Sequence, residues 1–383
     1  MSPFINEIYK GGGAPFSFRP PKKHNKRMNY MKIKIDNKQT IKVGLKYIQI
    51  EITGFCNMRC AHCRAWGQDK VHMNYENINK IFKLLKRNMD EDFVLGLSGG
   101  EPFLHPEMMK ILKLAKKKGF ERVGITTNAS VVNEKMLKQI DDLKFKRIVL
   151  QTSLDNIDET EFDNFRNFKG AYKGVFKFLN LIKEYENIQS AVRMTVTPKT
   201  LSIMEKLAEL VYNNGCNELS YSFVKPVGAA TKDIVVSPDE RKRILEEVER
   251  LTKTYKNKMR ISTGDPLKII SNKEVVKQYE NVSKNELVIA GCVAGIAAFH
   301  IEVNGNITPC SMMKERISNI IENKSIRKIE KEITNSDLVK AFIMKNYKGK
   351  CGSCELKQIC GGCRAVAKES TNDCLGEDIL CFK

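Results

Sequence analysis

Two patterns of apolar residues alternate between residues 46 and 223. Short β-rich runs are followed by longer runs whose apolar residues recur every three or four positions, as at Ile78, Ile81 and Leu85. The β-rich runs predict strands at Tyr47–Thr53, Phe93–Ser98, Arg122–Thr127, Arg147–Ser153, Val192–Val196 and Glu218–Phe223. The periodic runs predict helices at Glu76–Met89, Pro106–Lys118, Glu134–Leu143, Tyr172–Glu186 and Ile203–Asn214. Such alternation is typical of parallel βαβ units, and six units are too few to close an eight-stranded barrel, so we predict an α/β fold with a partial, open (β/α)6 barrel.

The pattern changes in the second half of the chain. A long helix is predicted at Pro238–Lys256, and an irregular stretch follows as far as about Leu287. His300–Val303 and Asn306–Thr308 predict a hairpin, because the intervening Asn304-Gly305 pair suits a type I′ turn.

The C-terminal tail from Cys351 is rich in Cys and Gly and poor in apolar residues, so it is expected to need metal to hold its shape. We therefore divide the chain into a basic flexible segment (1–45), the partial barrel (46–230), a helical linker region (231–290) and a small Cys-rich domain (291–383).

The charge balance is strongly basic, with 65 Lys and Arg residues against 45 Asp and Glu residues and a formal net charge of +20. A basic field attracts nucleic acid, anionic peptides or acidic metabolites. The lysines are spread along every predicted helix, and no stretch interleaves aromatic with basic residues, so we expect no nucleic-acid partner. The one local concentration is Lys22, Lys23, Lys26 and Arg27.

No apolar run approaches the roughly 18 to 20 residues that cross a bilayer. Met1–Lys26 has neither a continuous apolar stretch nor a small-residue cleavage site, and it does not resemble a signal peptide. We therefore expect a cytoplasmic protein without membrane contact, whose cysteines are reduced.

The 12 cysteines are grouped along the chain. Cys56, Cys60 and Cys63 form one group, Cys216 stands alone, and eight more fall between residues 292 and 381. Grouped thiolates in a reduced protein are typical of metal sites rather than of core packing.

The first group forms a C-x3-C-x2-C motif, Cys56 to Cys63, directly after a predicted strand. A four-iron cluster takes thiolate ligands, so three cysteines on one loop leave one iron without a protein ligand. An open metal position distinguishes a reactive site from a structural one. A ferredoxin-like electron carrier and a zinc loop are the alternatives, although zinc prefers a second Cys/His pair and His62 is badly placed to supply it.

This motif, after the first strand of a βα barrel, resembles the radical S-adenosylmethionine (SAM) superfamily. The resemblance implies that the three thiolates hold a [4Fe–4S] cluster and that SAM chelates its free iron. One electron then cleaves SAM to a 5′-deoxyadenosyl radical, which removes a hydrogen atom from the substrate. His62 occupies the position, usually aromatic, that packs near the adenine in this family.

The second predicted strand ends in Gly99-Gly100-Glu101, and paired glycines allow a backbone to approach a ligand closely. The resemblance implies that this segment contacts the methionyl amino group of SAM, with Glu101 accepting its hydrogen bond. A simple strand–helix turn is the alternative interpretation.

The next predicted strands end near Asn128 and Ser153, which resemble family segments that line the SAM pocket. The resemblance implies that Ser153 and Arg166 hold the SAM carboxylate, and Arg193 competes for that role. A surface salt bridge is the alternative for either arginine.

The later cysteines resemble the SPASM extension, which binds two auxiliary iron–sulfur clusters. Its Cys-Gly-Gly-Cys-Arg variant with a downstream Asp and a terminal Cys is matched by Cys360–Arg364, Asp378 and Cys381. By that match the first auxiliary cluster is held by Cys292, Cys310 and Cys363. The second is held by Cys351, Cys354, Cys360 and Cys381. A zinc ribbon within residues 351–363 is the alternative, but its five-residue central gap is short for such modules.

Two cysteines remain. Cys374 is predicted to complete the first auxiliary cluster, to be a spare thiol, or to act catalytically by donating a hydrogen atom to a substrate radical. Cys216 is predicted to be an inert core residue.

Family members with this extension mostly modify peptides and proteins. The resemblance therefore implies hydrogen abstraction from a residue of a ribosomally made peptide or protein, leading to crosslinking, epimerisation or oxidation. Tetrapyrrole side-chain modification in haem-type biosynthesis and a non-catalytic iron–sulfur electron carrier are the alternatives. Because about 45 residues precede the first predicted strand, we expect a separate leader-binding protein or direct recognition. A low-potential donor such as a ferredoxin or flavodoxin is the expected electron source.

Overall fold

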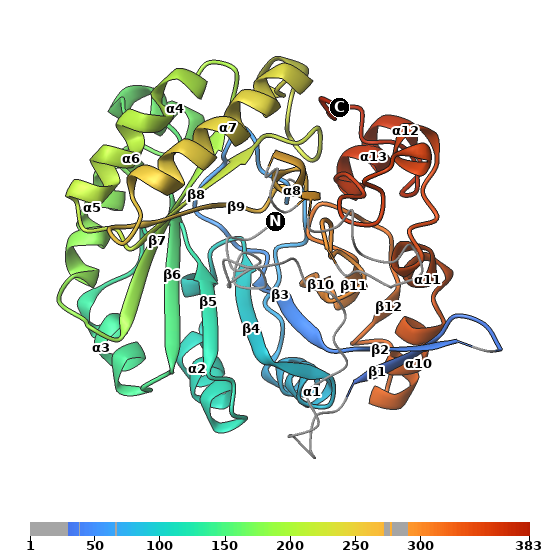
Figure 1. The fold of residues 1–383 in the computed structure, drawn as a ribbon. Coiled ribbons are helices and arrows are strands. Elements are labelled where there is room, and N and C mark those ends of the chain that lie inside the picture. The colour runs from blue at the N-terminus through green and yellow to red at the C-terminus, as the bar shows by residue number, and fades with distance from the viewer. Residues whose placement is uncertain (1–29, 38, 66, 272–275, 278–289) are drawn as a thin grey trace.

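The fold is built around one large twisted sheet. The computed structural model describes residues 30–383 except 38, 66, 272–275 and 278–289. The sheet has ten strands in the order β12-β11-β10-β3-β4-β5-β6-β7-β8-β9 (Figure 1). Neighbouring strands are parallel from β10 through β3 to β9 and antiparallel from β10 to β12. The strands are β3 (Leu45–Thr53), β4 (Met89–Gly99), β5 (Arg122–Thr126), β6 (Arg147–Ser153), β7 (Ile188–Val196), β8 (Glu218–Phe223), β9 (Arg260–Thr263), β10 (Ala298–Ile301), β11 (Asn306–Thr308) and β12 (Ser318–Asn319).

Helices connect the parallel strands and lie on the outside of the curved sheet (Figure 1). They are α1 (Tyr75–Lys86), α2 (Met108–Lys117), α3 (Glu134–Asp142), α4 (Glu159–Arg166), α5 (Ala171–Ile182), α6 (Met204–Asn213) and α7 (Pro238–Thr254). The predicted apolar stripe of α1 is buried, with Ile78, Ile81 and Leu85 fully enclosed, and Asn74 caps the helix by accepting a 2.8 Å hydrogen bond from the amide of Asn77. Among the described residues, no helix combines the length and the apolar character needed to cross a lipid bilayer.

The partial α/β barrel predicted from the sequence is confirmed. The six predicted strands are β3 to β8, and each predicted helix has its counterpart between them. The short helix α4 was not predicted, because its polar sequence has a weak apolar stripe that buries Phe162 and Arg166.

The predicted boundaries of the linker need correction. β9, within the predicted helical linker 231–290, pairs in parallel with β8 and so extends the barrel sheet. β10, within the predicted Cys-rich domain 291–383, pairs in parallel with β3 on the other side. Four-residue strands at these edges have too little pattern to be recognised without their partners.

The N-terminal segment is also not flexible throughout, as residues 1–45 were predicted to be. β1 (Met31–Lys34) and β2 (Thr40–Val43) form an antiparallel hairpin beside α10 (Figure 1). Alternate side chains of this hairpin, including Ile33 and Val43, are buried, which explains why the strands are held. The basic group at residues 22–27 lies outside the described residues.

The predicted hairpin of β10 and β11 is present, but its turn differs from the prediction. Gly305 has φ +86°, whereas Asn304 does not have the positive φ that a type I′ turn requires. The amide of Gly305 donates a 2.8 Å hydrogen bond to the carbonyl of Glu302, so a four-residue turn closes the hairpin.

The C-terminal part of the chain is helical and irregular, and it gathers at one side of the barrel (Figure 1). Its helices are α8 (Lys268–Ser271), α10 (Ile326–Asn335), α11 (Asp337–Ile343), α12 (Gly349–Ser353) and α13 (Arg364–Thr371). The cysteine-rich tail lies on α12, α13 and the loops around them.

Candidate active site

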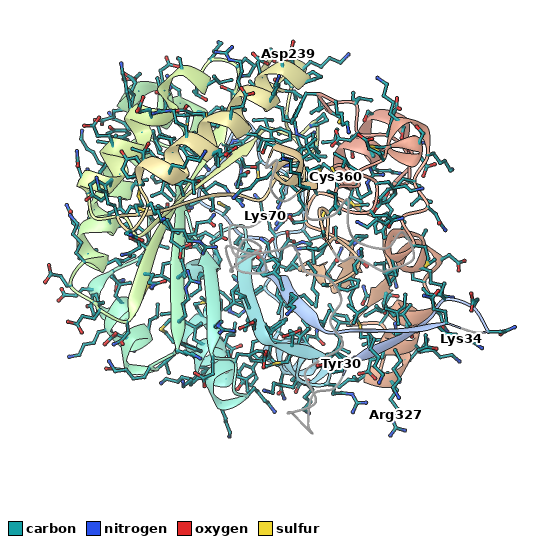
Figure 2. The ribbon with its side chains drawn as sticks, in the orientation of Figure 1. Tyr30, Lys34, Lys70, Asp239, Arg327 and Cys360 are labelled. Carbon is teal, nitrogen blue, oxygen red and sulfur yellow. The ribbon has the colours of Figure 1, made fainter. Side chains whose placement is uncertain are left out.

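The cysteines of the first motif lie at the carboxyl end of the central strands, where ligands bind in parallel α/β sheets. Cys56, Cys60 and Cys63 are all half-buried, and all three line a cavity of about 510 Å³. Lys70, from the same long loop after β3, lies near the middle of the molecule (Figure 2) and lines this cavity as well. The structure therefore gathers the three predicted ligands in one wall of its main cavity.

Gly99 and Gly100 line the cavity beside this loop. A Cβ atom on Gly99, whose φ is +140°, would lie 2.1 Å from the carbonyl oxygen of Thr53, and one on Gly100 would lie 2.1 Å from that of Phe55. The amide of Gly100 donates a 2.8 Å hydrogen bond to Thr53. The paired glycines thus allow the end of β4 to pack directly against the cysteine loop, a cause that the sequence did not reveal.

Glu101 lies behind the residues that line the cavity, and its contact with SAM stays a prediction. Its side chain is fully buried and is not among those lining the cavity. The carboxylate accepts hydrogen bonds from the amides of Phe103 (3.1 Å) and Asn128 (2.6 Å) and from the hydroxyl of Thr127 (2.8 Å). Burial raises the pKa of Glu101 to about 7, although these hydrogen bonds oppose the rise. Glu101 therefore ties the end of β5 to the end of β4.

Asn128, which Glu101 positions, faces the cavity. Its Nδ2 lies 3.8 Å from Cys56 Sγ and 2.8 Å from the side-chain oxygen of Asn57. The side-chain oxygen of Asn128 accepts a 3.0 Å hydrogen bond from the amide of Ser130. Asn128 thus contacts the cysteine motif itself, as well as lining the predicted SAM pocket.

Arg166 is buried and forms an ion pair with Asp155, so the surface salt bridge considered from the sequence is wrong for this residue. Its Nη1 lies 3.7 Å from Cys60 Sγ. Although burial opposes it, Asp155 raises the pKa of Arg166, which therefore stays charged. Arg166 is thus a fixed cation beside the cysteine motif.

Ser153 and Arg193 stand opposite each other on the parallel strands β6 and β7, and both line the cavity. Burial lowers the pKa of Arg193 to about 10, and the nearby Arg166 contributes to this fall. The three residues predicted to bind the SAM carboxylate, Ser153, Arg166 and Arg193, therefore all line the cavity, and two of them are arginines.

His62 also lines the cavity, and its ring stacks on Phe165, with 4.7 Å between ring centroids and 8° between planes. Burial, together with the charge of Arg166, lowers the pKa of His62 to about 4. The imidazole is therefore neutral at pH 7 and presents a flat, uncharged surface, in keeping with its predicted place beside an adenine.

A buried carboxylate anchors the cysteine loop to the C-terminal part of the chain. Glu51 on β3 is fully enclosed and lies 2.7 Å from Arg64 Nη2 and 3.1 Å from His300 Nε2. Arg64 follows Cys63, and its Nη1 donates a 3.2 Å hydrogen bond to the carbonyl of Ser311. Although burial opposes it, Arg64 and His300 lower the pKa of Glu51 to about 2.

Two sets of electrostatic contacts join the auxiliary cysteines, and the amide of Cys292 also donates a 3.2 Å hydrogen bond to the carbonyl of Cys360. Burial raises the pKa of the Cys310 thiol to about 12, and nearby Cys292 and Cys363 add to the rise. Burial and Cys363 likewise raise the pKa of Cys292. The three cysteines predicted to hold the first auxiliary cluster therefore lie near one another.

In the second group, burial raises the pKa of Cys360 to about 12, with Cys381 contributing. Cys381 in turn lies near Cys351, which adds to the rise of its pKa after burial and Asp378. Cys354 follows α12 and is half-buried near Lys383. Cys381 is therefore near Cys351 and Cys360, and Cys354 and Cys381 are both near Lys383, while the ligand set itself stays a prediction.

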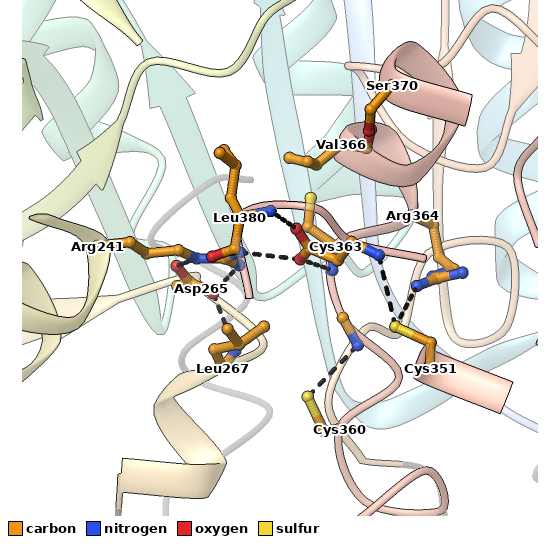
Figure 3. Close-up of polar contacts among 12 residues, drawn as sticks. Arg241, Asp265, Leu267, Cys351, Cys360, Cys363, Arg364, Val366, Ser370 and Leu380 are labelled. Atoms are coloured by element: carbon orange, nitrogen blue, oxygen red, sulfur yellow. Dashed lines mark hydrogen bonds and ion pairs between the residues drawn. The ribbon is translucent and has the colours of Figure 1, made fainter. Parts of the chain in front are cut away.

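Arg241 joins the barrel to this second group (Figure 3). The fully buried guanidinium binds both carboxylate oxygens of Asp265, at 2.8 and 2.7 Å, and lies 2.9 Å from Asp378 Oδ2. Asp378 accepts a 2.7 Å hydrogen bond from the amide of Cys363, and its own amide lies 3.5 Å from Cys351 Sγ. One arginine of α7 thereby positions residues next to both cysteine groups.

Two further cations are buried in the array. Arg364 Nη2 lies 3.4 Å from Cys351 Sγ (Figure 3), and its Nη1 donates a 2.7 Å hydrogen bond to the carbonyl of Gly376. Burial lowers the pKa of Lys345 to about 8, although nearby Cys360 and Cys292 oppose the fall. These cations offset the negative charge of the thiolates that a cluster would require.

Cys374 is joined to the cysteine array through Arg364, whose Nη1 donates a 3.2 Å hydrogen bond to the Cys374 carbonyl. It is buried, does not line the main cavity, and is near Glu315, which adds to the burial that raises its pKa to about 12. Its predicted catalytic or ligand role stays a prediction, and the neighbours that the structure gives the thiol are Glu315, Lys368 and Asp373. Cys216 is buried in the hydrophobic core, as predicted.

The separation of the sulfur atoms bears on the zinc alternatives. Tetrahedral zinc, with Zn–S bonds of about 2.3 Å, holds its sulfurs about 3.8 Å apart. Within the described ranges, which contain every cysteine, no three cysteine sulfurs lie within 4.8 Å of one another. No group of three cysteine sulfurs in the described residues therefore has the spacing of a tetrahedral zinc site.

Several functional contacts were missed by sequence reasoning. Glu51 is an acidic residue within an apolar strand, and Arg241 falls on the apolar stripe of α7, three residues before Ile244. The sequence pattern places both charged residues at positions expected to be buried, but it does not show which partners neutralise their charges.

Comparison with known proteins agrees with this geometry. Residues 50–211 match the family model described as the radical SAM superfamily. The chain is 26% identical to an AdoMet-dependent heme synthase from Methanosarcina barkeri, over 88% of this chain and 96% of the relative. It is also 26% identical to the antilisterial bacteriocin subtilosin biosynthesis protein AlbA of Bacillus subtilis, over 80% of this chain and 66% of the relative.

The fold is similar to that of Streptococcus suis SuiB bound to S-adenosylmethionine. The TM-score is 0.72 at 18% sequence identity, covering 90% of this chain and 78% of SuiB. SuiB bound to the precursor peptide SuiA gives a TM-score of 0.69.

Proposed function

This chain belongs to the radical SAM superfamily and has a SPASM-type C-terminal region, and we propose that it removes a hydrogen atom from a residue of a ribosomally made peptide or protein. The observation that carries the proposal is the cavity at the carboxyl end of the sheet, whose wall contains Cys56, Cys60 and Cys63. The product would be a crosslinked, epimerised or oxidised residue.

The residues around the cavity fit the expected [4Fe–4S] cluster and SAM. Cys56, Cys60 and Cys63 would hold the cluster, which supplies the electron that splits SAM to a 5′-deoxyadenosyl radical. Ser153 and Arg193 would receive the SAM carboxylate, because both face the cavity and Arg193 is cationic. The neutral ring of His62 would pack against the adenine.

Arg166 would take a different part from the one first assigned to it. Its guanidinium is committed to Asp155 and lies beside Cys60, so it stabilises the negative charge of the thiolate ligands. Glu101 would act through Asn128, which it holds at the cavity wall.

Two auxiliary iron–sulfur clusters would occupy the C-terminal cysteine groups. Cys292, Cys310 and Cys363 would bind one, and Cys351, Cys354, Cys360 and Cys381 the other. The division is supported by the way the thiols of each group affect one another's pKa. A ferredoxin or flavodoxin would supply electrons, and a separate leader-binding protein would present a peptide.

Tetrapyrrole side-chain modification is the second candidate. It is favoured by the heme synthase relative, to which this chain is similar over 96% of the relative's length. The peptide proposal is supported by the likeness to AlbA and by the fold that this chain shares with SuiB.

The test uses anaerobically reconstituted protein with SAM and a low-potential reductant. A precursor peptide encoded beside the gene should change in mass or residue chirality while 5′-deoxyadenosine accumulates. Turnover of a sirohaem-derived tetrapyrrole with peptides inert would refute the peptide proposal in favour of the second candidate. Clusters that are reduced without any SAM cleavage would refute both, and would indicate an electron carrier.

A further inference from the structure

Lys225 is an unusual cation in the main cavity. It follows β8 directly, lines the cavity, and is 8% exposed. Its ammonium has no hydrogen-bond or ion-pair partner among the residues that the structure describes. Because the residue is so little exposed and lines the cavity, its ammonium meets solvent through the cavity, where a cation attracts an anionic group.

The surroundings of Lys225 reinforce this positive charge. Its Nζ lies 4.4 Å from the centroid of the Phe223 ring, and the guanidinium of Arg241 lies 4.8 Å from the same ring. Asp265 is near enough for Lys225 to contribute to the lowering of its pKa, but its oxygens are taken by Arg241 and by the amide of Leu267. The face of the Phe223 ring offsets part of the positive charge of the ammonium. The Asp265 carboxylate could offset the rest, but its oxygens are bonded to other groups.

Apolar side chains line the cavity next to Lys225 in the sequence and close to the cysteine motif, together with the polar Ser222 and Ser311. Val224, Val227 and Met312 line the same cavity. The loop after β8 returns to the motif, where the amide of Ala229 donates a 3.2 Å hydrogen bond to the carbonyl of Cys63. The lining also contains other cations, such as Arg64 and Arg193, but apolar side chains beside the Lys225 ammonium suit a substrate group that joins an apolar body to an anion.

We propose that Lys225 binds a carboxylate of the substrate and so orients the substrate in the cavity. The proposal rests on the proposed function, because it assigns the substrate end of the same site. The carboxylate belongs either to an acidic side chain or C-terminus of a peptide or to a side chain of a tetrapyrrole, and both offer the same charge-assisted hydrogen bond to the ammonium.

The test compares acidic and neutral probes on the anaerobically reconstituted protein. One pair is coproporphyrin III and its tetramethyl ester, followed by fluorescence quenching. The other is a short glutamate-containing peptide, acetylated and amidated, and its glutamine counterpart, followed by calorimetry. The variants are Lys225→Met, Lys225→Gln and the conservative Lys225→Arg, and the control is Lys232→Met, because Lys232 is exposed a few residues away.

Lys225→Met and Lys225→Gln should weaken binding of one acidic probe roughly ten- to hundredfold, as expected for loss of a hydrogen bond to a charged group. Lys225→Arg should retain most of the affinity, and the neutral probes should bind the wild type and all variants alike. The acidic probe that responds identifies the source of the carboxylate. Thermal unfolding should show no loss of stability in Lys225→Met, because an unpaired buried charge is removed.

Equal binding of acidic and neutral probes by the wild type would overturn the proposal. A loss of SAM affinity in Lys225→Met as large as the loss of affinity for the acidic probe would also overturn the proposal, because the ammonium would then bind the SAM carboxylate. Binding is measured without turnover, so a protein that discriminates acidic from neutral probes through Lys225 but never cleaves SAM would refute the proposed function and leave this site standing.

Discussion

At the scale of single residues, buried charges connect the parts of the site. Inside the sheet, the Glu51 carboxylate lies beside both Arg64 and His300. The Arg64 guanidinium also donates a hydrogen bond to the carbonyl of Ser311. Removing one partner of such a group leaves the other charge enclosed and unpaired, which is more costly than loss of an exposed ion pair. These residues therefore position the cysteine loop, and Arg64 also lines the cavity.

Glu51→Gln should destabilise the protein by about 3 kcal/mol at pH 7, from the lowering of its pKa from 4.5 to about 2. Because the pKa falls on folding, the ionised carboxylate stabilises the folded state above pH 4.5, and this contribution is lost as the pH falls from 4.5 toward 2. Denaturant unfolding of wild type and variant should thus converge in acid.

The control for this prediction is Glu205→Gln, because the Glu205 side chain is 59% exposed and pairs with Arg250 at the surface. It should change the free energy of unfolding by less than about 1 kcal/mol. A difference between wild type and Glu51→Gln that persists unchanged below pH 3 would contradict the assignment of the stabilising charge to Glu51.

At the scale of elements, α7 holds the barrel and the cysteine tail together. Its N-terminus carries a capping box between Ser237 and Glu240, and its apolar stripe packs on the sheet. Arg241 lies on that stripe, and its side chain forms ion pairs with Asp265, which follows β9, and with Asp378 in the tail. The helix thus orients the backbone next to Cys363.

Arg241→Met should destabilise the protein by about 3 to 5 kcal/mol, because two buried carboxylates lose their common partner. It should also lower the iron bound at the C-terminal groups while the signal of the SAM-responsive cluster persists, as measured by iron analysis and electron paramagnetic resonance. Arg250→Met on the same helix is the control, since Arg250 is about half exposed. Equal iron loss in both variants would contradict the role given to Arg241.

The elements that the sequence predicted well are those whose burial depends on their own pattern. Strands β3 to β8 each contain buried apolar residues in a short β-rich run, and α1 has a continuous apolar stripe, so local sequence largely determines them. β9 and β10 are four residues long and depend on distant partners, since Phe299 pairs with Ile48. That pairing could not be inferred from local pattern.

The candidate site was predicted in part: its cysteine motif was found from the sequence, whereas the contacts that depend on packing were not. The spacing of Cys56, Cys60 and Cys63 and their place after a strand sufficed to locate the cavity. The orientation of Glu101 and the distance of Cys374 from the cavity depend on packing that no motif expresses. Lys225 had no motif at all, and its burial without a partner became visible in three dimensions.

At the scale of the whole molecule, the C-terminal region is part of one structure with the barrel. β10 extends the sheet, Arg64 contacts the loop after Cys310, and Arg241 binds Asp378. Ser311 and Met312 from this region line the main cavity together with barrel residues. The cavity is therefore shaped by both regions.

We expect the tail beyond residue 350 to depend on metal more than the barrel does, because its buried aliphatic side chains larger than alanine are Ile359, Val366 and Leu380. Removing iron anaerobically with a chelator should therefore make residues 351–383 more sensitive to proteolysis and faster in amide exchange than the barrel. Mass spectrometry of the fragments measures this. Unchanged protection of the tail in iron-free protein would contradict its dependence on metal.

The most direct test of the account is the triple replacement Cys56→Ala, Cys60→Ala and Cys63→Ala in anaerobically reconstituted protein, with Cys216→Ala as the control thiol outside every group. The variant should lose about four irons per chain, in keeping with a four-iron cluster, and all formation of 5′-deoxyadenosine from SAM, whereas the control keeps both. Continued SAM cleavage by the triple variant would contradict the central claim.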